Sequence, residues 1–162
     1  MLPHVTRKLF SMAAAGLLVG AGLVLGGGTA GATAAQCSGG ANGFVDIPDS
    51  FNGTAVEAEG VSNSTNPSSS AVVNQEYATI NGVQRGFGRI SVSGQPGIQF
   101  GLWMDVSNDG GRTWIQCGPF GASGVDTKTT AAYPTNNDPN RKFRTCGSVS
   151  GPGGNIQCLD WW

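Results

Sequence analysis

Residues 73–93, VNQEYATINGVQRGFGRISVS, decide the fold that we predict for this chain. Two runs rich in strand-forming residues flank Asn81-Gly82, the residue pair most typical of a two-residue hairpin turn, because both turn positions require positive φ. The register set by this turn places apolar residues opposite each other, Ile80 with Val83 and Val73 with Ile90. Cross-strand apolar pairs stabilise one register, so the stretch predicts an antiparallel β-hairpin.

The next stretch, residues 99–107, alternates between apolar and polar side chains, as a strand with one buried face does. Its core face holds Phe100, Leu102, Met104 and Val106. Trp103 lies on the other face, where we expect a second sheet to cover it; exposure for binding is the alternative.

Further short strands are predicted along the rest of the chain. They cover residues 44–47, 54–59, 112–120, 142–149 and 155–161. Residues 62–70 form a Ser/Asn-rich loop or linker, and residues 121–140 form a long loop. So many short strands with little helical periodicity predict an all-β fold, either a β-sandwich or a small barrel.

The N-terminal 34 residues are typical of a secretory signal peptide. A positively charged start precedes an apolar run over residues 9–25, and Ala32-Thr33-Ala34 forms an A-x-A cleavage site. Cleavage leaves residues 35–162 as one secreted domain; a retained anchor is the alternative. The chain has nine Lys and Arg against ten Asp and Glu, with no basic cluster. We therefore expect neither nucleic acid nor a membrane as partner after processing.

All four cysteines follow the predicted cleavage site, and an even count in a secreted chain predicts two disulfides. Four cysteines allow three pairings. Cys146 and Cys158 flank the turn residues 151–154 almost symmetrically, which favours one bridge between them and a second between Cys37 and Cys117. A zinc site is disfavoured because residues 35–162 contain no histidine and no C-x-x-C pair.

Residues 107–114, SNDGGRTW, match the pattern S-x-D-x-G-x-x-W at every fixed position. The stretch resembles an Asp-box, a hairpin motif of sialidases and other secreted β-proteins, where its role is structural. The resemblance implies that Ser107, Asp109, Gly111 and Trp114 build a turn. A calcium loop beginning at Asp105 is the alternative, but its twelfth position is Gln116, which lacks the bidentate carboxylate. We expect no metal and no cofactor.

Residue types for catalysis are scarce. The only histidine, His4, lies in the predicted signal peptide, so histidine-based acid–base and triad chemistry is excluded from the mature chain. Oxidised cysteines supply no thiolate nucleophile. A carboxylate pair such as Glu57 and Glu59, on one strand face, is the remaining catalytic option. We therefore predict a protein that is not an enzyme.

The C-terminal pair Trp161-Trp162 is the strongest binding signal. Consecutive residues of a strand point to opposite faces, so one Trp can enter the core while the other meets water or a partner; packing of both is the alternative. Trp is enriched at interaction hot spots. Trp103, Trp161 and Trp162 are the candidate binding residues.

The Ala/Gly-rich start and the Gly/Ser/Asn-rich body resemble small secreted actinobacterial β-proteins with disulfides. The ending, from Phe143 through Cys146 and Cys158 to Trp162, shares this resemblance. The chain is also similar in kind to the adaptor-like components of umbrella toxin particles. This resemblance implies an accessory subunit of an extracellular antagonistic complex, and it assigns no residue roles.

Three functions follow from these observations. The first is a secreted, non-catalytic binding or assembly protein with an extracellular protein partner. The second is a hydrolase inhibitor that presents residues 121–140 as a pre-organised loop. The third is a carbohydrate-binding module that binds a glycan through Trp103 or Trp162.

Protein recovered from the culture medium of a secreting host is expected to begin at residue 35 and to contain no free thiol. Intact-mass and peptide-mass spectrometry with and without an alkylating reagent measure both properties. Alkylation of any of the four cysteines without prior reduction contradicts the expected oxidised state.

Overall fold

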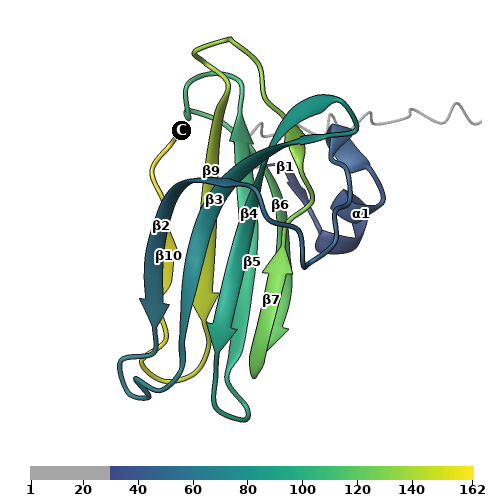
Figure 1. The fold of residues 1–162 in the computed structure, drawn as a ribbon. Helices are drawn as coiled ribbons and strands as arrows, with labels where there is room; N and C mark the ends of the chain where they lie inside the picture. The colour runs from purple at the N-terminus through teal and green to yellow at the C-terminus, as the bar shows by residue number, and fades with distance from the viewer. Residues whose placement is uncertain (1–29) are drawn as a thin grey trace, which may run out of the picture.

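The computed structural model describes residues 30–162, which form a β-sandwich of two five-stranded sheets (Figure 1). The all-β fold with two disulfides is therefore confirmed. The predicted signal peptide falls mainly on residues 1–29, outside the described residues. In the part of the chain that is described, no helix has the length and apolar content needed to cross a membrane.

The first sheet has the strand order β1-β6-β5-β9-β10. Its strands are β1 (Ala30–Ala32), β5 (Gln99–Ser107), β6 (Ile115–Ser123), β9 (Lys142–Val149) and β10 (Ile156–Cys158). β1 pairs with β6 in parallel, and every other pair of this sheet is antiparallel. β1 precedes the predicted cleavage point, so processing at that point would remove it.

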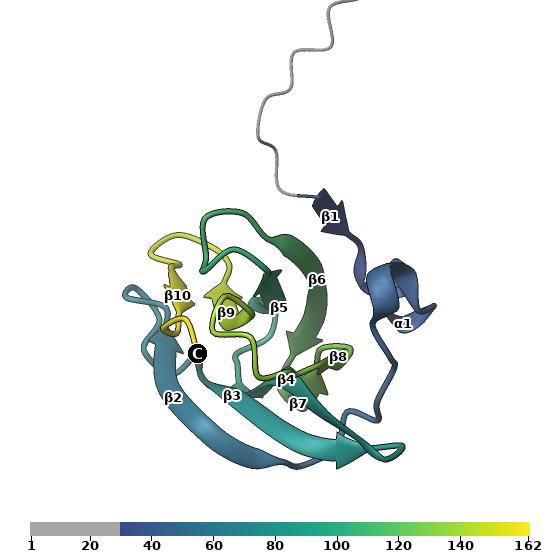
Figure 2. The same cartoon turned by 90° about the horizontal axis from the view of Figure 1, so that it is seen from above.

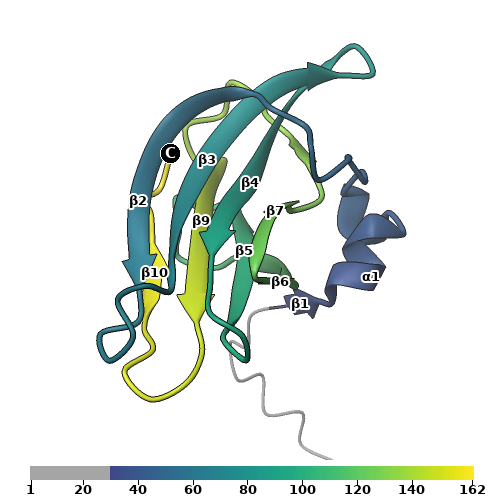
Figure 3. The same ribbon diagram turned by 60° about the horizontal axis from the view of Figure 1, so that its bottom comes forward.

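The second sheet has the order β2-β3-β4-β7, and a short β8 also pairs with β4. Its strands are β2 (Thr54–Ser62), β3 (Ser70–Ile80), β4 (Val83–Ser93), β7 (Val125–Thr129) and β8 (Tyr133–Pro134). All of its pairs are antiparallel. Figure 3 shows this sheet curving across the front of the first one.

The β3–β4 hairpin has the predicted register. Ile80 pairs with Val83 and Val73 pairs with Ile90. Asn81 and Gly82 adopt φ values of 52° and 76°, as the two-residue turn requires. The predicted core face of β5 is also confirmed, since Phe100, Leu102, Met104 and Val106 are buried.

The two sheets approach each other closely where glycines face bulky side chains. A Cβ at Gly88 of β4 would lie 2.5 Å from Cγ2 of Thr145 on β9, and one at Gly147 would overlap Val73 of β3. Thr145 is fully buried, and its amide donates to Oε1 of Gln75 at 2.9 Å. The sheet separation therefore depends on residues without side chains at these positions.

Several predicted segments differ from the structure. Of the strand predicted at residues 155–161, only Ile156–Cys158 is a strand, and the strand predicted at residues 112–120 begins at Ile115. Residues 44–47 are not a strand; only Val45 forms an isolated bridge, with Ala132. Residues 121–140 are not one long loop, because β7 and β8 lie within them and pair with β4. β7 has the sequence VDTKT, with one apolar residue, so its sequence lacks the apolar alternation by which strands are recognised. Residues 135–141 remain as the longest loop of this region, which shortens the segment that an inhibitor could present.

A short helix covers the side of the sandwich next to β6 (Figure 2). α1 (Ala34–Ser38) starts at the N-cap Thr33, whose side chain accepts from the Gln36 amide in a capping box. A 3₁₀ turn, η1 (Ala41–Gly43), follows. Cys37 of α1 is fully buried and bonded to Cys117 of β6, so the helix is covalently joined to the first sheet.

The second disulfide joins Cys146 of β9 to Cys158 of β10, across neighbouring strands. Both bridges follow the pairing favoured from the sequence, and no cysteine among residues 30–162 is free. Disulfides persist in oxidising environments, so the fold is consistent with such a compartment.

One end of the sandwich is closed by hydrogen bonds of the Asn63 side chain and of the neighbouring backbone. The buried Asn63 donates to the carbonyl of Ser150 at 2.9 Å and accepts from the amides of Thr65 and Asn66. The amide of Ser64 donates to the carbonyl of Gly153 at 2.8 Å. These bonds fix the Ser/Asn-rich loop after β2 to the turn between β9 and β10.

Removal of the two disulfides is expected to destabilise the protein unequally. Cys37–Cys117 spans 80 residues and Cys146–Cys158 spans 12. Loop-closure entropy in the unfolded chain then predicts losses of about 4.5 and about 3 kcal/mol. Denaturant unfolding of the Cys37→Ser/Cys117→Ser and Cys146→Ser/Cys158→Ser double variants measures this difference. Equal losses, or a larger loss for the shorter loop, would contradict the entropic account.

Candidate functional site

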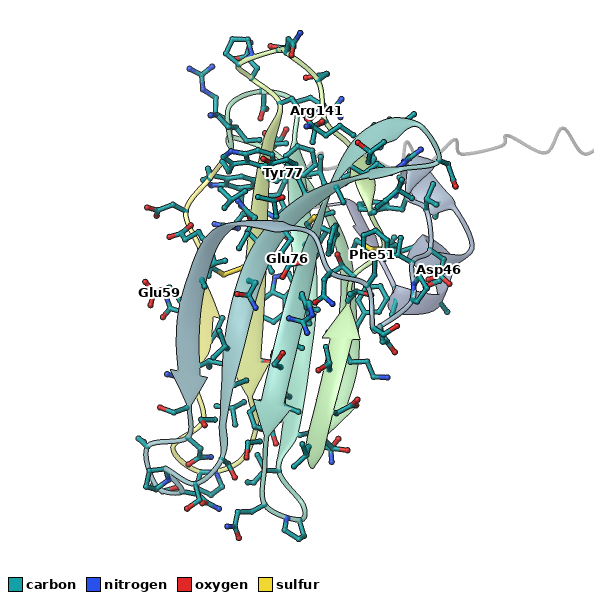
Figure 4. The ribbon with its side chains drawn as sticks, viewed as in Figure 1. Asp46, Phe51, Glu59, Glu76, Tyr77 and Arg141 are labelled. Atoms are coloured by element: carbon teal, nitrogen blue, oxygen red, sulfur yellow. A yellow bond between two sulfur atoms is a disulfide. The ribbon has the colours of Figure 1, made fainter. Side chains whose placement is uncertain are left out.

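Most residues singled out from the sequence meet at the end of the sandwich opposite Asn63. The turn at residues 107–114, the loop at residues 135–141 and Trp161-Trp162 come together there. Gly110 donates its amide to the carbonyl of Asn140 at 2.9 Å, and Gly111 lies against Trp161. In Figure 4, the labelled Tyr77 and Arg141 lie at this end, whereas Glu59 lies at the β2 edge. We name this end of the molecule the aromatic end.

The turn at residues 107–114 is held by side-chain hydrogen bonds. Oδ1 of Asp109 accepts from the Thr113 amide at 2.8 Å, and Oδ2 accepts from the Thr113 hydroxyl at 2.7 Å. The Ser107 hydroxyl donates to Asp109 at 2.8 Å and accepts from the Gly111 amide at 2.8 Å. Gly111 has φ of 90°, and a Cβ there would lie 3.1 Å from the Trp161 ring. Glycine is required here for both reasons.

Hydrogen bonds from the Thr113 side chain and backbone, and from Ser107, lower the pKa of Asp109 to about 2. These donors favour the ionised carboxylate, because each donates to an oxygen that carries negative charge. Asp109 is thus a structural carboxylate whose lone pairs serve the turn.

Behind this turn, the outer face of the first sheet carries a group that we name the Arg144 cluster, formed by Asp105, Trp114, Arg144 and Trp161. The Arg144 guanidinium lies 5.0 Å from the centre of the Trp114 ring and 4.5 Å from that of Trp161. Both distances are within the range of cation–π attraction. The two rings lie 5.8 Å apart at 58°.

Asp105 orients the Arg144 side chain through an ion pair. Asp105 and Arg144 are cross-strand partners, and Oδ2 of Asp105 accepts from Nε at 3.1 Å and from Nη2 at 2.7 Å. Asp105 is buried, and this burial raises its pKa, although Arg144 acts in the opposite direction. The cluster therefore holds an ion pair under two aromatic rings rather than in open solvent.

Trp103 lies on the same outer face, two residues before Asp105 on β5. It pairs with Cys146 of β9, which lies two residues after Arg144. The second sheet covers the opposite face of β5, so the expectation that it covers Trp103 is wrong; Trp103 is half-buried by its own sheet. Trp103, Trp114 and Trp161 all retain some exposed surface.

Trp162 points the other way from Trp161, towards the second sheet. Its ring stacks on Tyr77 at 5.6 Å and 20°, and it packs at a tilt against Phe143. Its amide and carbonyl exchange hydrogen bonds with those of Phe143, both at 3.0 Å. The residue is nevertheless 37% exposed. The two rings thus lie on opposite sides of the backbone. Trp161 packs on the outer surface of the first sheet, and Trp162 packs at the open end of the core.

A cavity of about 240 Å³ adjoins Trp162. We name it the Trp162 pocket. Its walls are Gln84, Thr135, Asn136, Asn137, Asp138, Pro139, Arg141, Lys142, Phe143 and Trp162. It combines one exposed aromatic ring with amide, carboxylate and cationic side chains, so its lining is more polar than that of most small-molecule pockets.

The remaining catalytic option is not assembled into such a site. Oε2 of Glu57 accepts from the Asp160 amide at 2.9 Å, and Glu59 is exposed on the β2 edge. Neither lines the Trp162 pocket. Among residues 30–162, no group of three or more His, Cys, Asp or Glu side chains is placed to hold a metal ion.

Sequence patterns did not point to Arg144 or Tyr77, and they marked the loop residues of the Trp162 pocket only as part of the candidate inhibitor loop at residues 121–140. Arg144 lies on the same face of β9 as Cys146, two residues away. Its ion-pair partner Asp105 lies on β5, which is distant in sequence. Which residues of β5 and β9 face each other depends on the register between the two strands, and this register could not be predicted from the single sequence. The Asn-Asn-Asp-Pro run at residues 136–139 is typical of a turn, and nothing in it marks a cavity.

No family model, curated protein sequence or solved structure matches this chain.

The turn predicts a change of stability with pH. The pKa of Asp109 in the fold, about 2, lies below its ordinary value of 3.8, so the ionised carboxylate stabilises the fold above about pH 4, and this contribution is lost as the pH falls towards 2. Urea unfolding of the wild type and of Asp109→Asn over this range measures it. We expect the variant to be less stable at neutral pH and to lose less stability on acidification. Parallel pH profiles would contradict the assignment.

Proposed function

We propose that the protein is a secreted, non-catalytic binding or assembly subunit that acts through contacts with another extracellular protein. The observation that carries this proposal is the outer face of the first sheet, where Trp103 adjoins the Arg144 cluster. Protein–protein hot spots are enriched in Trp and Arg and depleted in Lys and Glu. A face with three partly exposed Trp, two of them packed against one Arg, has this composition.

The energetics of the face also suit a partner. Asp105 and Arg144 are already paired, so a partner covering the rings would not have to desolvate an unpaired charge. Rigid aromatic side chains lose little conformational entropy on binding. Two disulfides and the hydrogen-bonded turn fix the strands that carry these aromatic side chains. Less conformational entropy of the protein is therefore lost on binding.

The residue inventory supports a function without catalysis. The chain has a single histidine, His4, and the four cysteines are paired. The predicted signal peptide and the disulfides support secretion. We infer an extracellular assembly as the setting, and an antagonistic toxin complex is the example that the resemblance of the sequence favours.

The proposal predicts that Trp103→Ala loses partner capture by at least about tenfold. Tagged protein would be used to affinity-purify material from the medium of the producing organism, with quantification by mass spectrometry. Val72→Ala is the matched control, because Val72 is 47% exposed on a strand of the other sheet. It should capture the same partner as the wild type.

Thermal unfolding by circular dichroism must show that both variants are folded at the assay temperature. Equal capture by Trp103→Ala and the wild type would overturn the assignment of this face. The absence of any specifically retained protein would overturn the proposed function.

A further inference from the structure

We propose that the Trp162 pocket binds one pyranose ring of an extracellular glycan. This site is distinct from the proposed protein-binding face, because neither Trp103 nor any member of the Arg144 cluster lines it. The inference does not depend on the proposed protein partner, and the two can fail separately.

The aromatic wall of the pocket is held in one orientation. Tyr77 stacks on one face of the Trp162 ring, and Trp162 lines the cavity whereas Tyr77 does not. Phe143 and the paired backbone further restrict the ring. An aromatic face carries negative potential and attracts the weakly positive C–H groups of an apolar surface. A pyranose presents such C–H groups on its ring face and hydroxyls around its edge.

The polar wall offers both donors and acceptors, which hydroxyl groups require. Oδ1 of Asn136 accepts from the Asp138 amide at 3.0 Å, and Oδ1 of Asp138 accepts from the Asn140 amide at 2.9 Å. These bonds orient both side chains and leave the Asn136 amide NH₂ and the second Asp138 oxygen to meet a ligand. Within residues 30–162, no hydrogen bond engages the side chain of Asn137. The loop thus provides planar amide and carboxylate groups beside the aromatic ring.

The loop that carries these groups is fixed before any ligand arrives. Nε of Arg141 donates to Oδ1 of Asn108 at 2.6 Å, and Nη1 donates to the Pro134 carbonyl at 3.0 Å. The guanidinium also lies 5.0 Å from the centre of the Tyr133 ring. A pre-organised loop loses less entropy on binding, which matters for a small ligand that makes few contacts.

Volume and charge narrow the ligand class. A cavity of about 240 Å³ is below the range of about 300–1,000 Å³ for drug-sized ligands, and it suits a single ring. The lining residues include two cationic side chains, Arg141 and Lys142, and one carboxylate, Asp138. Both a neutral sugar and a sugar acid are compatible with this balance of charges. The pyranose ring is the shared chemistry, and the experiment distinguishes the two kinds.

The test is a titration of the protein recovered from the culture medium with glucose, galactose, mannose, N-acetylglucosamine and glucuronate. Indole N–H signals in two-dimensional NMR report on each Trp separately. We expect saturable shifts of the Trp162 signal by at least one sugar, with Kd on the order of millimolar for a ligand of this size. Preference for glucuronate would assign a sugar acid, and preference for another sugar would assign a neutral ring.

Variants locate the site. Asn137→Ala removes an exposed side chain, so it should fold normally and weaken binding about two- to tenfold, the effect of one hydrogen bond. Trp162→Phe should weaken it further by reducing the aromatic surface. Trp103→Ala is the control and should bind sugar as the wild type does. Absence of saturable shifts with all five sugars, or unchanged binding by Asn137→Ala and Trp162→Phe, would overturn the proposal.

Discussion

The close approach of the two sheets at Gly88 and Gly147 is the constraint on which the rest of the structure depends. Thr145 and Val73 occupy the space that side chains at these positions would fill. At these two positions the sheets can therefore approach each other closely only because Gly88 and Gly147 have no side chain. Tyr77 of the second sheet and Phe143 of the first sheet both pack against Trp162. These contacts at the open end of the core depend on the spacing of the two sheets, which the glycines allow.

The strands that the sequence predicts best are those with local determinants. The β3–β4 hairpin follows from Asn81-Gly82, whose φ values are positive in the structure, and β5 follows from its alternation. β7 was not found because its residues are mostly polar and its pairing with β4 is long-range. The site shows the same division. The turn around Asp109 and the opposed rings of Trp161-Trp162 follow from short patterns, whereas the Asp105–Arg144 pair depends on a register between distant strands.

The Arg144 cluster and the Trp162 pocket face in different directions, but the same residues hold both in place. Trp161 and Trp162 are consecutive residues after β10, and their rings lie on opposite sides of the backbone, one in the Arg144 cluster and the other at the Trp162 pocket. The turn at residues 107–114 contacts both regions, through Gly111 against Trp161 and through Asn108, which accepts from Arg141. A disturbance of this turn therefore reaches both surfaces at once. Variants that separate the two proposals must lie outside it, as Trp103 and Asn137 do.

The opposite end of the sandwich has a practical consequence for handling the protein. There the buried Asn63 and the turn after β9 hold the loops together, and the neighbouring turn at residues 94–98 is largely exposed. A single cysteine introduced at the exposed Gln95 would attach the molecule to a sensor chip with Trp161 and Trp162 at the end away from the chip. Immobilised in this orientation, every copy on the chip would present the same face to the analyte.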